Sequence, residues 1–515
     1  MAEFLTGFSN ILWGAPVLIL LGIVGLLYGI RTKFFQIRKM GYILKNTAGE
    51  MFKKGGGASG DKGTLTPLQA VCSALAGCVG TANIAGVATA MVIGGPGAVF
   101  WMWVIALLGM MTKCVEVTLG QYYRIQGKDG VYYGGPMYYI ERGMGKKWKP
   151  LAIFFAVTII LGGLGTAAFA QPYTMSTALE RTFHIPAWVV TVAAAAICGI
   201  VLIGGVKGIG KFCEKITPAM CLIYVVGALG VIIVNIRFVP QAFAAIFKYA
   251  FAPMPAIGGL AGSTLALALR QGAARGTFSN EAGCGSSPIT HATAITDHPF
   301  KEGMYGSFEV FVDTIIVCTM TSLAIMCSGS DIWASGVKAE ALTMSAFDAT
   351  YGTTIGNLLV TIPLALFAFS TMVGWEINYE SAFFYIFPKM ETSKIFKVLI
   401  RALAGSRLHC AWQHAGPGLD CCRYCLWSVV RSECDRSDRA FRCVHENLPR
   451  LQRQIHPQDQ THFRAAALHR QGLISAHVRG ALQGAPRVLG LTRDKFFVSL
   501  KIFLKIPCNL LLILV

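Results

Sequence analysis

Charged residues are scarce in this sequence. Lys, Arg, Asp and Glu make up 14% of its 515 residues, whereas 54% are hydrophobic. Because a soluble domain carries roughly 25% charged residues, this scarcity argues against a soluble protein and predicts a polytopic membrane protein. The charges that remain are mostly basic, with a formal net charge of +19. Cytoplasmic loops of membrane proteins are commonly basic, so the excess predicts no nucleic-acid partner.

No cleavable signal peptide is expected. Residues 11–30 are apolar for about 20 residues, the length of a membrane span rather than of a signal core. Further apolar segments follow at residues 66–93, 97–123, 150–170, 187–206, 216–236, 262–290, 304–328 and 355–385. Basic residues concentrate in every second linker, at residues 31–62, 124–149, 207–215 and 389–401. By the positive-inside rule these linkers face the cytoplasm, which predicts a multi-pass cell-membrane protein with its N-terminus outside.

Two of the apolar segments contain residues that interrupt a helix. The first holds VGTANIAG (79–86) and the second holds SNEAGCGSSP (279–288). Backbone groups freed in lipid are costly unless protein, water or a ligand replaces their partners. A freed helix N-terminus suits a carboxylate, and freed carbonyls suit a cation. Interrupted spans at matching places in two halves are typical of secondary transporters; glycines that only permit close helix packing are the alternative.

The spacing of the two interrupted segments predicts an internal repeat. With residues 66–93 as core helix one, residues 262–290 form core helix six, which is the spacing of a five-plus-five inverted repeat. Core helix one then runs from inside to outside and core helix six runs the other way, as inversion requires.

Several sequence blocks resemble the sodium:alanine symporter family, also called the alanine or glycine:cation symporters, which share the LeuT fold. The blocks are TPLQAVCSALAGCVGTANIAGVATA (66–90), YGGPMYYIERGMG (133–145), GTFSNEAGCGSSPITHATA (276–294) and FAFSTMVGWEINYE (367–380). The resemblance covers residues 1 to about 403. It implies an all-α, LeuT-like protein with one extra N-terminal helix, which carries a small neutral amino acid together with Na⁺ and needs no other cofactor.

Candidate substrate contacts lie at the first interruption and on core helix eight. The backbone N–H groups of Ala82 and Asn83 and the hydroxyl of Thr81 can receive an α-carboxylate. The family usually has glycine in place of Ala82, so a methyl group narrows the room for substrate. The resemblance adds Gln171, Thr371 and Trp375 as substrate contacts; an interfacial amide and an interfacial tryptophan are the alternatives for Gln171 and Trp375.

The resemblance also implies a sodium site between core helices one and eight. Its oxygen ligands would be the carbonyls around Cys78 and Val79 and the hydroxyls of Ser370 and Thr371. A sodium ion there would neutralise the substrate carboxylate and couple the two binding events.

The remaining intramembrane polar residues receive structural roles. Asn280, Glu281, Gly283 and Gly285 are expected to hold the unwound backbone at the second interruption, with Arg275 close enough in sequence to pair with Glu281. Glu309 and Asp313 lie four residues apart and are expected to form a water-facing gate, with a cation site as the alternative. Lys113 and Glu116 are expected to form an ordinary ion pair near the inner end of a helix.

Two other classes of protein are kept beside the symporter. A cation channel would show substrate-gated sodium flux without amino-acid accumulation. A membrane hydrolase would use Cys284, His291 and Glu281 as nucleophile, base and orienter, although their spacing does not favour it.

Lysine is absent from residues 405–494, which hold thirteen Arg, seven of the ten His and six of the sixteen Cys. No stretch there is apolar for 18 residues, although the family should supply its last two core helices at this point. The abrupt change is typical of a wrong reading frame; a soluble tail is the alternative, and the cysteine spacing does not fit zinc.

We therefore expect the chain to have four parts: the extra helix and basic linker (1–62), core helices one to eight (63–403), a region with the last core helices missing or scrambled (404–494), and an apolar tail (495–515).

Overall fold

A computed structural model describes residues 14–51, 65–163, 171–255, 262–329 and 339–390, together with Ala167 and Ala170. These residues all belong to one compact unit. The expected parts at 404–494 and 495–515 lie outside the described residues.

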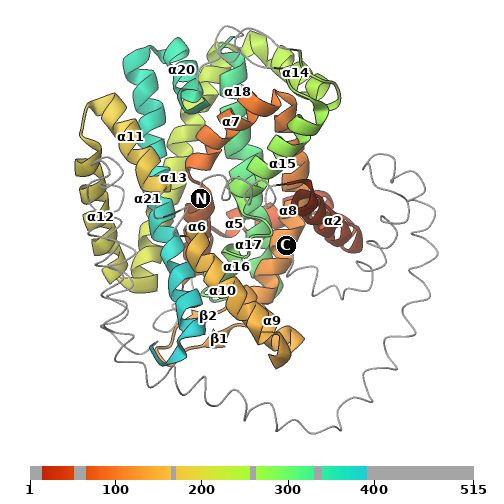
Figure 1. Cartoon of the computed structure of the whole chain (residues 1–515), viewed down its shortest axis with the longest axis vertical. Coiled ribbons are helices and arrows are strands. Elements are labelled where there is room, and N and C mark those ends of the chain that lie inside the picture. The colour runs from red at the N-terminus through yellow and green to blue at the C-terminus, as the bar shows by residue number, and fades with distance from the viewer. Residues whose placement is uncertain are drawn as a thin grey trace, which may run out of the picture. The chain divides into compact units, whose positions relative to one another are not determined.

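The described elements are almost all helices (Figure 1). In chain order they are α2 (Ala15–Arg31), α3 (Phe35–Arg38), α4 (Met40–Asn46), α5 (Ala48–Met51), α6 (Pro67–Cys78), η1 (Thr81–Asn83), α7 (Ala85–Gly94), α8 (Gly97–Tyr122), β1 (Ile125–Gln126), β2 (Tyr132–Tyr133), α9 (Pro136–Met144), η2 (Lys146–Trp148), α10 (Lys149–Gly163), α11 (Gln171–Phe183), α12 (Ala187–Ile203), α13 (Gly205–Val234), η4 (Ile236–Phe238), α14 (Val239–Phe251), α15 (Leu265–Asn280), α16 (Ser287–His291), α17 (Pro299–Val310), η5 (Phe311–Cys318), α18 (Thr319–Cys327), α20 (Ala339–Tyr351), α21 (Thr353–Ile386) and η6 (Pro388–Met390).

Helices lie on every apolar segment that the sequence predicts. Among the described residues, four helices are long and apolar enough to cross a membrane, or five if the bent pair α6 and α7 is one span. The four are α8, α13, α21 and the continuous helix Pro299–Cys327. Shorter apolar helices cover Pro16–Arg31 and Ala187–Ile203.

The described residues also contain one small β-sheet beside the helices. β1 and β2 pair as an antiparallel hairpin, with Ile125 opposite Tyr133. The Asp129 carboxylate accepts hydrogen bonds from the Val131 N–H at 3.0 Å and the Tyr133 hydroxyl at 2.7 Å, which stabilises the turn.

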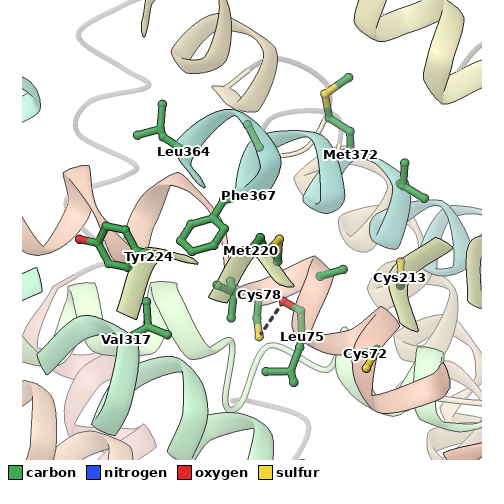
Figure 2. Close-up of a cluster of buried hydrophobic side chains, with 14 of the residues drawn as sticks. Cys72, Leu75, Cys78, Cys213, Met220, Tyr224, Val317, Leu364, Phe367 and Met372 are labelled. Carbon is green, nitrogen blue, oxygen red and sulfur yellow. Dashed lines mark hydrogen bonds between the residues drawn. The ribbon is translucent and has the colours of Figure 1, made fainter. Parts of the chain in front are cut away.

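The long helix α8 packs against α15 and α17, and α21 packs against α6, α11, α13 and α20 (Figure 1). Glycine permits close approach of α8 to α15, because a Cβ on Gly272 would lie 2.2 Å from the Ala98 carbonyl oxygen. Between α6, α13 and α21 lies an apolar core in which Tyr224, Met220 and Phe367 gather beside Cys78 (Figure 2). This core surrounds the C-terminal end of α6, where the first interruption begins.

Candidate functional site

The first helix is interrupted where the sequence predicts it. A capping box between Thr66 and Gln69 begins α6, and α6 ends at Cys78. Val79 and Gly80 then adopt extended conformations, η1 forms a single short turn, and α7 starts at Ala85. The two helical halves are bent by 60°. Residues 79–84, which we call the first break, therefore expose backbone groups that a continuous helix would have paired.

Side chains satisfy only some of the backbone groups at the first break. Asn83 Oδ1 accepts from the Gly80 N–H at 2.9 Å, and Gln171 Oε1 accepts from the Thr81 N–H at 3.4 Å. The Asn83 N–H donates to the Gly80 carbonyl at 3.2 Å. The Asn83 N–H, which was predicted to receive the carboxylate, is therefore already hydrogen-bonded within the break. Within the described residues, the Ala82 N–H has no hydrogen-bond partner, so it remains available to a ligand.

A cavity of about 260 Å³ opens at the first break. Its lining residues come mainly from η1, α7, α11, α15 and α21, with one residue from α20. The lining residues are Thr81, Ala82, Ala85, Gly86, Thr89, Ala170, Gln171, Tyr173, Thr174, Thr177, Ala178, Arg181, Arg275, Phe278, Met344, Val360, Thr361 and Leu364. Three predicted substrate residues, Thr81, Ala82 and Gln171, therefore share one cavity.

Thr371 and Trp375 lie next to this cavity without lining it. A Cβ on Gly80 would lie 3.0 Å from Thr371 Oγ1 and 3.1 Å from Gln171 Nε2, so these two side chains meet over the break. The Trp375 indole is buried against Gly77 and contacts the Tyr379 ring at 6.3 Å between centroids. Trp375 thus lies beside the last turn of α6.

The predicted sodium residues come from the two helices that the sequence expected to meet. α6 and α21 cross closely, because a Cβ on Gly374 would lie 2.9 Å from the Ser73 carbonyl oxygen. Thr371 Oγ1 donates to the Phe367 carbonyl at 2.9 Å, which leaves its lone pairs free to accept. Ser370 Oγ donates to the same carbonyl at 3.0 Å and also contacts Met220 Sδ at 3.2 Å, on the side of α13.

The second interruption also lies where the sequence predicts it, and side chains of the protein pair its freed backbone groups. α15 ends at Asn280, and Glu281, Gly283 and Gly285 all have positive φ angles, of 53°, 94° and 76°. A side chain on Gly285 would be strained and would also meet Pro136 Cγ at 2.6 Å. Residues 281–286, the second break, therefore form a tight irregular turn.

Local side chains pair the backbone of the second break. Asn280 Oδ1 accepts from the Ala282 N–H at 3.0 Å, and Glu116 Oε2 accepts from the Gly283 N–H at 3.2 Å. The Ser286 hydroxyl donates to Glu281. The expected Arg275–Glu281 pair is absent from the ion pairs of the described residues, because Arg275 lines the cavity instead. Asn280 and Glu281 thus make their contacts at the second break, and their structural role there stays a prediction.

Lys113 supplies a buried positive charge to the second break. Its Nζ donates to the Asn280 carbonyl at 2.5 Å and to Glu309 Oε1 at 2.8 Å, and both charged side chains are fully buried. The expected Lys113–Glu116 pair was wrong, since each residue has a different partner. The freed carbonyl at the end of α15 is thus occupied by an ammonium group of the same chain.

Two buried carboxylates connect the breaks. Glu309 Oε1 accepts from Cys78 Sγ at 3.2 Å and from the Ser287 hydroxyl at 2.9 Å, one residue from each interrupted helix. Asp313 accepts from Asn83 Nδ2 at 2.7 Å and from the Ser279 hydroxyl at 2.8 Å. Both carboxylates are fully buried, so the expected water-facing gate at these positions was wrong. Sequence analysis missed this arrangement because the partners lie far apart along the chain.

A hydrolase site is not assembled by the three residues considered for it. His291 is fully buried and pairs with Glu302 at 2.6 Å and Glu309 at 3.4 Å. Cys284 is exposed, and no hydrogen bond joins it to His291 within the described residues. The same part of the chain contains no group of three or more His, Cys, Asp or Glu residues that could hold a metal ion.

Proteins similar in sequence to this chain include transporters. An uncharacterized transporter of Haemophilus influenzae is 43% identical over 75% of this chain and 82% of its own length. The sodium/alanine symporter AgcS of Methanococcus maripaludis is 37% identical over 73% of this chain and 82% of its own. The probable sodium/glutamine symporter GlnT of Bacillus subtilis is 37% identical over 72% and 75%.

Solved structures offer a weaker likeness. A manganese transporter of Eremococcus coleocola covers 66% of this chain and 69% of its own at 13% identity, with a TM-score of 0.44, which is too low to identify a shared fold. The sequence match is decisive by contrast, since residues 1–415 fit the profile of the Sodium:alanine symporter family. With a helical membrane unit, a cavity at an interrupted helix and this match, the chain belongs to the sodium:alanine symporter family.

Proposed function

We propose that this protein carries a small neutral amino acid, alanine or glycine, across the cell membrane together with Na⁺ by alternating access. The observation that carries the proposal is the cavity at the first break, which Thr81, Ala82 and Gln171 line together and beside which the Ala82 N–H has no hydrogen-bond partner among the described residues. A helix end with unpaired N–H groups suits a carboxylate. Family membership supports sodium coupling.

In this proposal the carboxylate of the amino acid binds at Thr81 and Ala82. Gln171 and Thr371 contact the substrate from α11 and α21, and Trp375 closes the site on the α6 side. Asn83 contributes by shaping the break, since its side chain holds both Gly80 and Asp313. Sodium binds between the Cys78 and Val79 carbonyls and the hydroxyls of Ser370 and Thr371, next to the carboxylate that it neutralises.

The proposed architecture is a LeuT-like five-plus-five inverted repeat. α6 and α7 form core helix one, and α15 and α16 form core helix six. Two interrupted helices, each with its break next to the other, support this arrangement because inverted-repeat transporters bind at such breaks. The basic linkers then face the cytoplasm and the N-terminus lies outside.

Uptake and binding measured on the full chain test the proposal. The 515-residue protein is reconstituted into proteoliposomes, and labelled alanine and glycine are supplied with an inward Na⁺ gradient or with choline in its place. We expect sodium-dependent binding in the 515-residue chain. In a version with residues 404–494 restored to frame, we expect accumulation above the equilibrium level with Na⁺ only. Flux that never exceeds equilibrium would indicate a channel, and absence of sodium-dependent binding to the purified protein would contradict the proposed site.

We also propose that residues 404–494 are translated out of frame, so that the last two core helices are missing or scrambled. The thirteen arginines without a lysine motivate this idea, and the family match ends at residue 415. Sequencing the DNA around codon 404 tests it directly. An intact frame that encodes the same Arg, His and Cys residues would remove the hypothesis. Binding without uptake is the expected behaviour of a chain that lacks these helices.

A further inference from the structure

The cavity at the first break extends well beyond the proposed substrate contacts. Gln171 and Arg181 both line it from α11, and ten residues of helix span about 15 Å. A cavity that holds one water needs about 10–15 Å³, so 260 Å³ is room for many waters or for more than one small amino acid. The Gln171 end of the cavity is only part of this space.

Contacts between α11 and α21 show in which direction each helix runs along the cavity. At one end, Gln171 and Thr371 meet over Gly80. At the other end, the hydroxyls of Thr182 and Thr361 lie 2.8 Å apart. The two helices therefore run antiparallel along the cavity, with the first break at one end and Arg181 at the other. In the proposed topology, in which the basic linkers face the cytoplasm, the Arg181 end is the outer end.

Arg275 lies between these two ends. It is on α15, four residues before Ser279, or about 6 Å along the helix. Ser279 shares Asp313 with Asn83, so that turn of α15 lies level with the first break. Arg275 is half-buried and lines the cavity. Two guanidinium groups thus follow one another from the outer end towards the Ala82 N–H.

The charges that line the cavity are all positive. Arg181 and Arg275 are lining residues, and no Asp or Glu is among the residues that line it. Asp348, which is not a lining residue, interacts electrostatically with Arg181, whereas the ion pairs of the described part of the chain include none with Arg275. A cavity lined by charges of one sign concentrates the opposite charge. The positive lining therefore favours an anionic group, such as a carboxylate, over a free sodium ion.

We propose that Arg275, assisted by Arg181, forms an outer binding position for the carboxylate of the amino acid, which is occupied before the substrate reaches the first break. The inference rests on the proposed amino-acid transport and adds a second position to it. Arg275 then governs how fast the substrate arrives, while the contacts at the break govern how long it stays.

The association rate of alanine tests this idea. Purified full-length protein in NaCl is mixed with alanine, and tryptophan fluorescence reports binding. We expect Arg275→Gln to lower the association rate at least about fivefold, with the dissociation rate unchanged, and Arg275→Lys to stay within about twofold. Arg237→Gln, an exposed arginine outside the cavity, is the matched control. Added choline chloride should slow association to the wild-type protein and not to Arg275→Gln; equal rates and equal salt dependence would overturn the proposal.

A second measurement does not depend on transport. Phenylglyoxal modifies arginine, and peptide mass spectrometry gives its rate at Arg275 and at Arg237. Propionate, which carries a carboxylate and no amine, should slow modification of Arg275 at least about threefold and leave Arg237 unchanged. Ethylamine should protect neither. Absence of propionate protection would overturn the outer position, whereas protection by propionate in a protein that binds no alanine would contradict the proposed function alone.

Discussion

The two breaks both free backbone N–H and C=O groups, but different partners are available to those groups at each break. At the first break, Thr81 and Ala82 line a cavity, and the Ala82 N–H has no hydrogen-bond partner among the described residues. At the second break, Lys113 and Glu116 occupy the freed carbonyl and N–H groups. An interrupted helix can therefore offer its backbone to a ligand or close it with side chains of its own. The difference teaches that glycine-rich interruption alone does not mark a binding site; the side chains brought from other helices decide.

The largest effect should come from removing the charge that closes the second break. Lys113→Met removes the nearer of the two basic partners of the buried Glu309 carboxylate and leaves only His291, at 3.4 Å; breaking one partner of a buried pair costs about 3–5 kcal/mol. We expect a large loss of thermal stability in detergent, measured by scanning fluorimetry and size-exclusion chromatography. The double variant Lys113→Met with Glu309→Met should lose less than the two single variants together. A single variant as stable as wild type would mean that the second break is not closed by this charge.

A smaller effect, on ligand affinity rather than stability, should follow from filling the first break. Gly80 has φ −132° and ψ −159°, which alanine adopts without strain. The added methyl group would crowd Thr371 and Gln171, and crowding of about 1–3 kcal/mol corresponds to roughly fivefold to 150-fold in affinity. Gly80→Ala should weaken sodium-dependent alanine binding by that factor. Gly199→Ala, which meets nothing within 4 Å, is the control, and equal affinities for both variants would contradict the expectation.

Two buried glutamines sharpen the contrast between the breaks. Gln171 faces the cavity, whereas Gln121 Nε2 donates to the Ala294 carbonyl at 3.2 Å, beyond the second break. Loss of a hydrogen bond costs about 0.5–1.5 kcal/mol. Gln171→Ala should lower alanine affinity and leave the unfolding temperature unchanged; Gln121→Ala should lower the unfolding temperature and leave affinity unchanged. Binding isotherms and thermal scans of both variants check this, and a shared loss of both properties would argue against the distinction.

The smallest effect is expected at an exposed ion pair outside both breaks. Lys301 lies 3.3 Å from Asp297 and holds the pKa of that carboxyl below its usual value by hydrogen bonding and charge attraction. The stabilisation is present at neutral pH and is lost as the pH falls through the lowered pKa. Because Asp297 is exposed, Lys301→Met should change stability by about 0–1 kcal/mol at pH 7 and by nothing in acid. Thermal scans at both pH values measure it, and a loss comparable to Lys113→Met would contradict the ranking.

Much of the fold could be predicted because local sequence encodes it. The apolar segments gave the helices, and the composition of residues 79–86 and 279–288 gave both interruptions. Gly283 and Gly285 were expected at the second break, and both have the positive φ that glycine tolerates. The β hairpin was missed, since a pair of two-residue strands has no periodicity to detect.

Charged residues were predicted less well, because spacing along one helix does not identify a partner on another. Lys113 and Glu116 are three residues apart, yet Lys113 pairs with Glu309, 196 residues further on. Arg275 was assigned to Glu281, six residues away, and instead lines the cavity. The one signal available was that an intramembrane charge needs a buried partner.

The sequence by itself determined that this chain is helical, that it lies in a membrane and that two of its helices break, because hydropathy and backbone freedom are local properties. Only the tertiary structure decided which break faces a cavity and which is closed. That decision depends on α8, α11 and α21, which bring Lys113, Gln171 and Thr371 to the breaks from distant parts of the chain. Burial and charge pairing across helices, rather than any local preference, set the outcome.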